Sequence, residues 1–260
     1  MSEDLSTHDD SAGEASMNRE RELATAFVGL ADTYAPDFDP LRLFDRLVHA
    51  CRSLLDVDAA AVMIADARGT LKTMAATEDG AAFIELMQMQ TGYGPCMDCY
   101  RTGEGRGVPD ITLEASRWPQ LNAAMDDAGY RSLHTVPVRF HDRVLGALTL
   151  LSADTGELPP GGPHLAQALA DSAALGLMHW SADPRGDDVV TRVQSAIAAK
   201  TVLEIAKGML AAHTGLPVNA AGRLLAGYAD RHRVSLAATA QALVDRDMEL
   251  AEVCERTVRT

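Results

Sequence analysis

Two cysteines in a glycine-rich stretch have the spacing in this chain that most suggests chemistry. The stretch TGYGPCMDCYRTGEG, residues 91–105, carries Cys96 and Cys99 in a C-x-x-C arrangement. This spacing occurs in redox pairs, where it favours a thiolate of low pKa, and Arg101 would strengthen that effect. It also occurs as half of a zinc site. Packing without any chemistry is the third interpretation.

The other cysteines argue against zinc. A closed zinc site needs four ligands, whereas Cys51 lies on a predicted core helix and Cys254 lies near the C-terminus. A redox pair of the thioredoxin type follows a strand and opens a helix, and the residues around Cys96 predict a loop instead. Packing is therefore the favoured role for Cys96 and Cys99, and redox sensing is the alternative.

The chain shows no catalytic motif. H-E-x-x-H, G-x-S-x-G, the Walker A pattern and G-x-G-x-x-G are all absent from the sequence. His134 lies in a predicted strand whose alternation could turn it into a cavity, although a structural histidine is the commoner role. We therefore expect no enzyme, no cofactor and no metal. The candidates for ligand or redox sensing are Cys96, Cys99, Trp118 and His134.

Charge is distributed unevenly along the chain. The 260 residues carry a net charge of −14, yet residues 190–244 hold six Lys and Arg against two Asp and Glu. Two domains with different partners explain this asymmetry. No apolar run reaches the ~18–20 residues that cross a membrane, and the N-terminus lacks the apolar core of a secretory signal. We therefore expect a cytoplasmic protein with reduced cysteines.

The elements around the cysteines predict an α+β domain. Helical spacing of apolar residues covers residues 17–33 and 40–55, with Asp39 as a plausible N-cap. Further along, the patterns predict a hairpin (59–77), a helix (80–90), a short strand (105–111), a helix (116–130), two strands (131–153) and a helix (161–180). This order predicts an antiparallel sheet flanked by helices.

After a polar stretch, SADPRGDD, the pattern becomes purely helical. Apolar spacing predicts a long helix over 190–213, a second over 220–228, and a third that Ser235 caps. The expected organisation is a disordered tail (1–16), the α+β domain (17–182), a linker (183–189), a three-helix domain (190–248) and a C-terminal tail (249–260).

The three-helix segment resembles the ANTAR domain, an RNA-binding antitermination module of bacteria. The resemblance is carried by Ile-Ala-Lys-Gly-Met-Leu (205–210), Gly215, Ala221, Leu225 with Ala229, and Leu236 with Ala240. It implies a dimer, joined through the 189–213 helix, that binds tandem stem-loops in nascent transcripts. The candidate RNA-binding residues are Lys200, Ala206, Lys207, Gly208, Arg223, Tyr228, Arg231 and Arg233.

The α+β segment resembles a GAF sensor domain of the kind fused to ANTAR modules in actinobacteria. The resemblance is carried by GPCMDCYRTGE (94–104), VPDI (108–111), RWPQL (117–121), AGYRSLHTVPV (128–138) and RVLGALTLL (143–151). It implies a cavity for an unknown small-molecule ligand. It also implies that Cys96 belongs to the family pattern, whereas Cys99 is a local substitution.

Several positions depart from the ANTAR pattern. Gly222 stands where an aromatic residue is frequent, Ala226 where an Arg is usual, Arg233 where an Asn is common, and Pro217 where a Ser or Asp cap is usual. Weak or altered RNA binding is therefore an alternative. So is a signalling protein whose C-terminal helices bind a protein partner, and more remotely a thiol-dependent reductase of the GAF fold.

Overall fold

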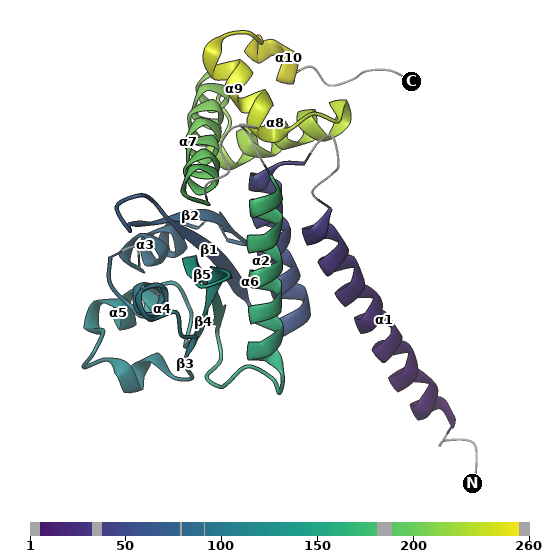
Figure 1. Cartoon of the computed structure of the whole chain (residues 1–260), viewed down its shortest axis with the longest axis vertical. Coiled ribbons are helices and arrows are strands. Elements are labelled where there is room, and N and C mark those ends of the chain that lie inside the picture. Colours follow the sequence, from purple (N-terminus) through teal and green to yellow (C-terminus); the bar gives the residue numbers. More distant parts are fainter. Residues whose placement is uncertain (1–5, 33–37, 79, 91, 181–188, 255–260) are drawn as a thin grey trace.

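The computed structural model describes residues 6–32, 38–78, 80–90, 92–180 and 189–254. Within these residues a sheet flanked by helices is followed by a purely helical region (Figure 1). The helices α1 to α6 and the sheet are called the N-terminal domain below, and the helices α7 to α10 the C-terminal domain. The expectation of an α+β domain followed by a helical domain is confirmed.

One antiparallel sheet of five strands organises the N-terminal domain. The strands are β1 (Ala59–Ala65), β2 (Leu71–Ala76), β3 (Arg106–Val108), β4 (Ser132–Phe140) and β5 (Arg143–Ser152), in the order β2-β1-β5-β4-β3. The central strand β5 pairs with β1 and β4, and Gly146 faces Ile64 and Val138 in those two ladders. A Cβ at Gly146 would lie 1.9 Å from the carbonyl oxygen of Met63, so only glycine allows the strands to approach this closely.

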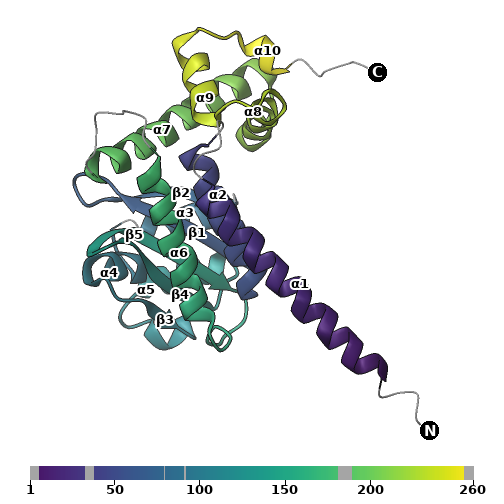
Figure 2. The same cartoon turned by 45° about the vertical axis from the view of Figure 1, so that its right-hand side comes forward.

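Helices cover both faces of the sheet. On one face lie α1 (Ser6–Ala31), α2 (Pro40–Leu55) and α6 (Gly162–His179), which share a core with alternate residues of β1, β4 and β5. On the other face lie α3 (Ala81–Gln90), α4 (Pro95–Thr102), η1 (Ile111–Glu114) and α5 (Pro119–Asp127), with a second core. Figure 2 shows α1 running outward from the body beside α6.

The cysteine stretch is a helix, which corrects the expectation of a loop. Pro95 occupies the first turn of α4, a position that needs no backbone N–H, and Gly103 ends the helix in the left-handed conformation at φ 71°. Cys96 and Cys99 both lie within α4 and are buried. The glycines that suggested a loop are the boundaries of this short helix.

The C-terminal domain contains α7 (Val189–Thr214), α8 (Val218–His232), α9 (Leu236–Asp245) and α10 (Leu250–Cys254). The three predicted helices are present, and Ser235 caps α9 by accepting a hydrogen bond from the Ala238 N–H at 3.2 Å. Gly215, at φ 72°, ends α7 as expected. Leu203, Leu225 and Leu243 are buried in the core among α7, α8 and α9.

Parts of both expected tails are helical in the structure. Residues 6–16 form the start of α1. At the other end α10 packs back through Val253, which is 1% exposed. The expected linker 183–189 lies outside the described residues except for Val189, which begins α7. In the described part of the chain, no helix has both the length and the apolar character to cross a membrane.

Candidate functional site

Two lysines of α7 share one carboxylate. Lys207 Nζ donates to both oxygens of Glu204, at 2.8 and 3.1 Å, and Lys200 Nζ lies 2.8 Å from Glu204 Oε1. The spacing of three and four residues places all three side chains on one face of the helix. Burial raises the pKa of Glu204, but the two lysines lower it more, so the pKa is below its usual value. The cluster therefore carries one net positive charge.

Gly222 gives Lys207 its position. A Cβ at Gly222 would lie 3.1 Å from Cε and 3.4 Å from Cδ of Lys207, so the aliphatic stem of the lysine occupies the space of a side chain at 222. An aromatic residue there would displace Lys207 from α8. Because this position departs from the ANTAR pattern, the side chain of Lys207 can lie against α8.

The remaining RNA candidates have different surroundings. Gly208 is exposed and has open space around its Cα, whereas Ala206 is buried in the helix packing. Tyr228 is half-buried and stacks on His232, with ring centroids 4.2 Å apart. Arg233 takes a left-handed conformation at φ 53° and ends α8. The three exposed cations of this region are Arg223, Arg231 and Arg233.

A cleft between the domains receives the lysine cluster. Its volume is about 710 Å³, and its walls are β2 with α3 on one side and α7 with α8 on the other. Lys200, Glu204 and Lys207 line it from α7, opposite Lys72 of β2. The arginines of α8 are not among the described residues that line this cleft. The structure therefore divides the candidate cations into a group inside the cleft and a group on the open surface.

Asp39 and Arg42, at the start of α2, join the two domains. Asp39 is 2% exposed, and its Oδ1 accepts from the Leu41 N–H at 2.8 Å as predicted for an N-cap. Its Oδ2 accepts from the Ser235 hydroxyl at 2.8 Å and from the Ala237 N–H. One carboxylate thus caps α2 and the N-terminus of α9, 196 residues away. Local sequence patterns predicted the first cap and contain no signal for the second.

Arg42 makes the second connection. Its guanidinium lies 2.7 Å from the carboxylate of Asp230 and donates to the carbonyl oxygen of Ala226 at 3.1 Å, both on α8. Ala226 packs against the shared core, where an arginine side chain would need room. At this departure from the ANTAR pattern, the chain thus has a small residue whose carbonyl oxygen accepts from an arginine of the other domain.

The two cysteines of α4 lie in a buried polar cluster. Cys96 donates to Gln90 Oε1 at 2.6 Å and lies 2.7 Å from Thr149 Oγ1. Burial raises the pKa of Cys96 to about 12 and that of Cys99 to about 11, in spite of hydrogen bonds that lower both. The thiols are therefore protonated at neutral pH, as expected for packing, and a redox role stays a prediction.

Gln90 is the unusual member of this cluster. It is fully buried, and its Nε2 has no hydrogen-bond partner among the described residues. A buried amide donor without a partner is costly, so this Nε2 is a group that a polar acceptor atom would stabilise. The sequence contained no signal for Gln90, because a lone glutamine on a helix is usually exposed.

Trp118 shares the second core with the cysteines, whereas His134 does not. Trp118 is 3% exposed, and the guanidinium groups of Arg106 and Arg117 lie 5.2 and 4.4 Å from its ring. His134 lies on β4 with its Nε2 3.2 Å from the Gly156 carbonyl. It alternates with Thr135, which faces α4, so it points to the other side of the sheet. There His134 lines a cavity of about 260 Å³ with Leu158 and Gln167, on the opposite side of the sheet from Cys96 and Cys99. Its role in ligand sensing stays a prediction.

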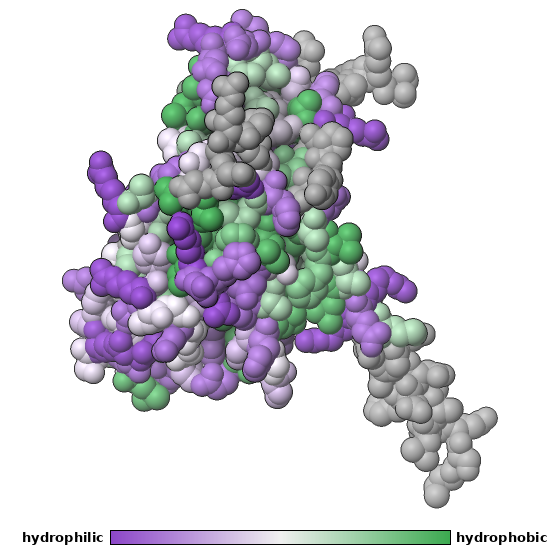
Figure 3. Space-filling model, in the orientation of Figure 1, coloured by the Kyte–Doolittle hydropathy of each residue, from purple (hydrophilic) through white to green (hydrophobic). Residues whose placement is uncertain are grey.

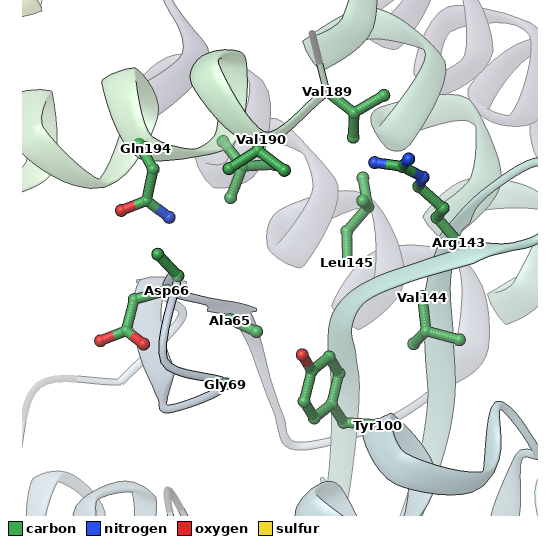
Figure 4. A pocket seen from close by; sticks show the side chains of 12 residues that line it. Ala65, Asp66, Gly69, Tyr100, Arg143, Val144, Leu145, Val189, Val190 and Gln194 are labelled. Atoms are coloured by element: carbon green, nitrogen blue, oxygen red, sulfur yellow. The ribbon is translucent and has the colours of Figure 1, made fainter.

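A second cavity between the domains has a volume of about 420 Å³ (Figure 4). The turn between β1 and β2, with Asp66, forms one wall, and the first turns of α7 form another. In Figure 4 the hydroxyl of Tyr100 points into the cavity, Arg143 approaches it from β5, and Val190 and Gln194 close it from α7. This size suits a small ligand, and domain interfaces are frequent sites for such cavities.

Apolar side chains gather on one surface of the molecule. Figure 3 shows them over α6 and the adjoining part of α1. Leu175 of α6 and Val28 of α1 are 47% and 68% exposed, and on α7 Val190 and Ile205 are 46% and 48% exposed. Exposed apolar patches of this kind are typical of surfaces that contact other molecules.

Comparison with known proteins assigns both parts of the chain. Residues 39–177, more than half of the chain, match the GAF domain, and residues 191–244 match the ANTAR domain. No curated protein gives a significant match.

Three solved structures show how the chain compares in three dimensions. The GAF domain of a phosphoenolpyruvate-protein phosphotransferase from Coxiella burnetii is 18% identical, with a TM-score of 0.49, covering 63% of this chain and 94% of that one. The GAF domain of an Acinetobacter phosphoenolpyruvate-protein phosphotransferase is 13% identical, with a TM-score of 0.47 and coverages of 68% and 93%. A domain of a sensor histidine kinase protein from Sinorhizobium meliloti is 16% identical, with a TM-score of 0.45 and coverages of 52% and 88%.

Proposed function

Because the chain belongs to the GAF domain family and carries an ANTAR domain after it, we propose that it is an RNA-binding transcription antitermination regulator of the actinobacterial type. Its ANTAR domain binds tandem stem-loops in nascent transcripts and keeps a terminator hairpin from forming. Its GAF domain senses a signal and controls that binding. The protein works in the cytoplasm and is not an enzyme.

The lysine cluster of α7 is the observation that carries the RNA-binding role. In a chain of net charge −14, Lys200 and Lys207 share one face of a helix next to Gly208, where open backbone lets a phosphate approach. Phosphates that displace Glu204 would bind both ammonium groups. Arg223, Arg231 and Arg233 add contacts from α8, where the RNA stem is recognised by shape and phosphate position.

The signal is proposed to be a small molecule that binds the GAF domain. Two places suit it. The amide of Gln90, without a partner beside Cys96, would hold a polar ligand atom inside the domain. The cavity of Figure 4 would let a ligand contact the GAF domain and α7 together.

Dimerisation through α7 is a further part of the proposal. The 189–213 segment lies almost entirely in α7, and Val190 and Ile205 give it exposed apolar positions that a second copy would cover. A dimer would present two ANTAR domains to a target that contains two stem-loops.

The two alternatives lose part of their support. Ala226 and the acidic end DRDMELAEVCE (245–255) favour a protein partner for the C-terminal helices. In the structure, however, Val253 packs α10 onto the domain, and the Ala226 carbonyl oxygen accepts from Arg42. A thiol-dependent reductase needs a reactive thiolate, whereas burial raises the pKa of Cys96 to about 12.

A titration with RNA tests the proposal. The full-length protein is titrated with labelled RNA that carries two tandem hairpins, and with RNA in which the stems are scrambled, at several salt concentrations. We expect tighter binding to the tandem hairpins, and weaker binding for K200Q and K207Q. The variant R68Q, which removes the same charge from an exposed turn of the GAF domain, serves as the control. Equal affinity for the two RNAs would show that specific recognition is wrong.

A further inference from the structure

We propose that Asp39 and Arg42 form a latch that holds the ANTAR domain closed against the GAF domain, and that opening this latch switches the protein from low to high RNA affinity. The proposal rests on the RNA-binding function proposed above and names how the same site is regulated. The latch consists of Asp39 and Arg42 of α2 with Ser235, Ala226 and Asp230 of the ANTAR domain.

Asp39 makes the closed arrangement specific. A helix N-terminus has backbone N–H groups without partners inside the helix, and a capping carboxylate satisfies some of them. Asp39 does this for α2 through Leu41 and for α9 through Ala237, and it also accepts from the Ser235 hydroxyl. When the domains separate, α9 loses one of its caps and Asp39 loses two of its three donors.

Arg42 adds a contact that can be broken from either side. The side chain of Arg42 is 23% exposed, and the side chain of Asp230 is 62% exposed. Water can therefore reach the ion pair, and pairs of this kind are weak enough to open and close. A contact that is specific in geometry and modest in strength suits a reversible switch.

The closed arrangement partly covers the two lysines of α7. Lys200 and Lys207 line the cleft of about 710 Å³ that β2 and α3 close from the GAF side. The side chains of Lys200 and Lys207 keep only 26% and 18% of their surface exposed in this arrangement. Movement of the ANTAR domain away from β2 would therefore increase the access of phosphates to both lysines.

The latch is connected directly to the sensor core. The helix α2 carries Asp39 at its N-terminus and packs along its length on α6, β1 and β2, with Leu47 and Cys51 fully buried. A ligand that shifts α2 by changing the GAF core would move the latch residues as well. Signal and RNA affinity are then coupled through one rigid helix.

Three variants of the full-length protein test the latch. R42Q and D230N each break the ion pair, and Asp230 is exposed enough for its variant to fold if R42Q does not. In D39N the asparagine still caps α2 well. Its single amide oxygen, however, cannot accept hydrogen bonds from the N-termini of both α2 and α9. R46Q is the matched control, because Arg46 is on the same helix and donates instead to Gly29 of α1.

Two measurements are made on each variant. Hydrogen exchange of the α9 N-terminus, including the Ala237 amide, reports the latch without any RNA. Titration with tandem-hairpin RNA reports the switch. If the closed state is about tenfold more populated than the open one, opening it should raise RNA affinity about tenfold. For R42Q the loss of a positive charge would by itself weaken binding, so a gain identifies opening.

We expect R42Q, D230N and D39N to exchange faster at α9 and to bind RNA more tightly, while R46Q matches the wild type. Faster exchange without a gain in RNA affinity would overturn the switch and leave RNA binding intact. Unchanged exchange in all three variants would overturn the latch itself. If neither the wild type nor any variant prefers tandem hairpins over scrambled RNA, the proposed function fails, and the switch fails with it.

Discussion

Replacing Glu204 by glutamine tests whether the two lysines of α7 contact RNA. Glu204 accepts from Lys207 at 2.8 and 3.1 Å, and Lys200 Nζ lies 2.8 Å from the same carboxylate. A phosphate that binds either lysine has to displace this carboxylate. E204Q removes the competing charge, so we expect it to bind tandem hairpins more tightly than the wild type.

The size of the gain follows from the two ion pairs. The side chain of Glu204 is 44% exposed, and those of Lys200 and Lys207 are 26% and 18% exposed, so solvent screens both pairs. Exposed pairs contribute about 0.2–1 kcal/mol each, and the two together oppose RNA binding by about 0.4–2 kcal/mol. Since about 1.4 kcal/mol is a factor of ten in affinity, the dissociation constant should fall about 2–30-fold.

The assay is a titration of labelled tandem-hairpin RNA at three salt concentrations. Two freed lysines should also steepen the salt dependence, by about one log unit of affinity per log unit of salt for each new phosphate contact. E249Q is the matched control, because it removes the same charge from an exposed position in the same domain. The reasoning is refuted if E204Q binds RNA no more tightly than E249Q does.

Four other measurements address the fold and the site. G146A should lose several kcal/mol of stability in urea unfolding, roughly 3 or more, because the new Cβ would collide with the Met63 carbonyl; a loss under about 1 kcal/mol would contradict the strand register. G208A should gain about 0.5–1 kcal/mol in helix stability yet bind RNA more weakly, which unchanged RNA binding would disprove. At pH 8 a thiol reagent should modify Cys254 first and reach the other three thiols only on unfolding, because burial raises the pKa to about 12, 12 and 11 for Cys51, Cys96 and Cys99. Because the pKa of Glu204 is lowered in the folded protein, its carboxylate stabilises the fold at pH values above the ordinary carboxyl pKa. This stabilisation is lost as the pH falls through the folded pKa, so the unfolding free energies of E204Q and the wild type should converge at low pH.

Local patterns in the sequence determined most of the elements. Apolar spacing predicted the helices and the strand pairs, because burial of one face imposes periods of 3.6 and 2 on the residue types. Asp39, Ser235 and Gly215 marked helix ends through backbone needs that a single residue meets. The motifs of residues 94–104 and 205–210 predicted the two families that the comparisons then identified.

The tertiary structure decided how those residues meet. Sequence patterns placed Cys96 in a loop and left open which face of the sheet His134 occupies, whereas the structure puts Cys96 in α4 and His134 on the opposite side of the sheet from it. Alternation along a strand tells which residues share a face but not which face looks toward a given helix.

The contacts between the domains were beyond the reach of the sequence for the same reason. The sequence predicts Asp39 as the N-cap of one helix. Its second role, capping α9, depends on contact with Ser235, which is 196 residues later in the chain. Likewise the sequence indicates an exposed cationic face at Lys200 and Lys207, and only the tertiary structure places them in a cleft beside β2. The type of a residue determines which groups its side chain can bind. The tertiary fold determines which of those groups lie within reach.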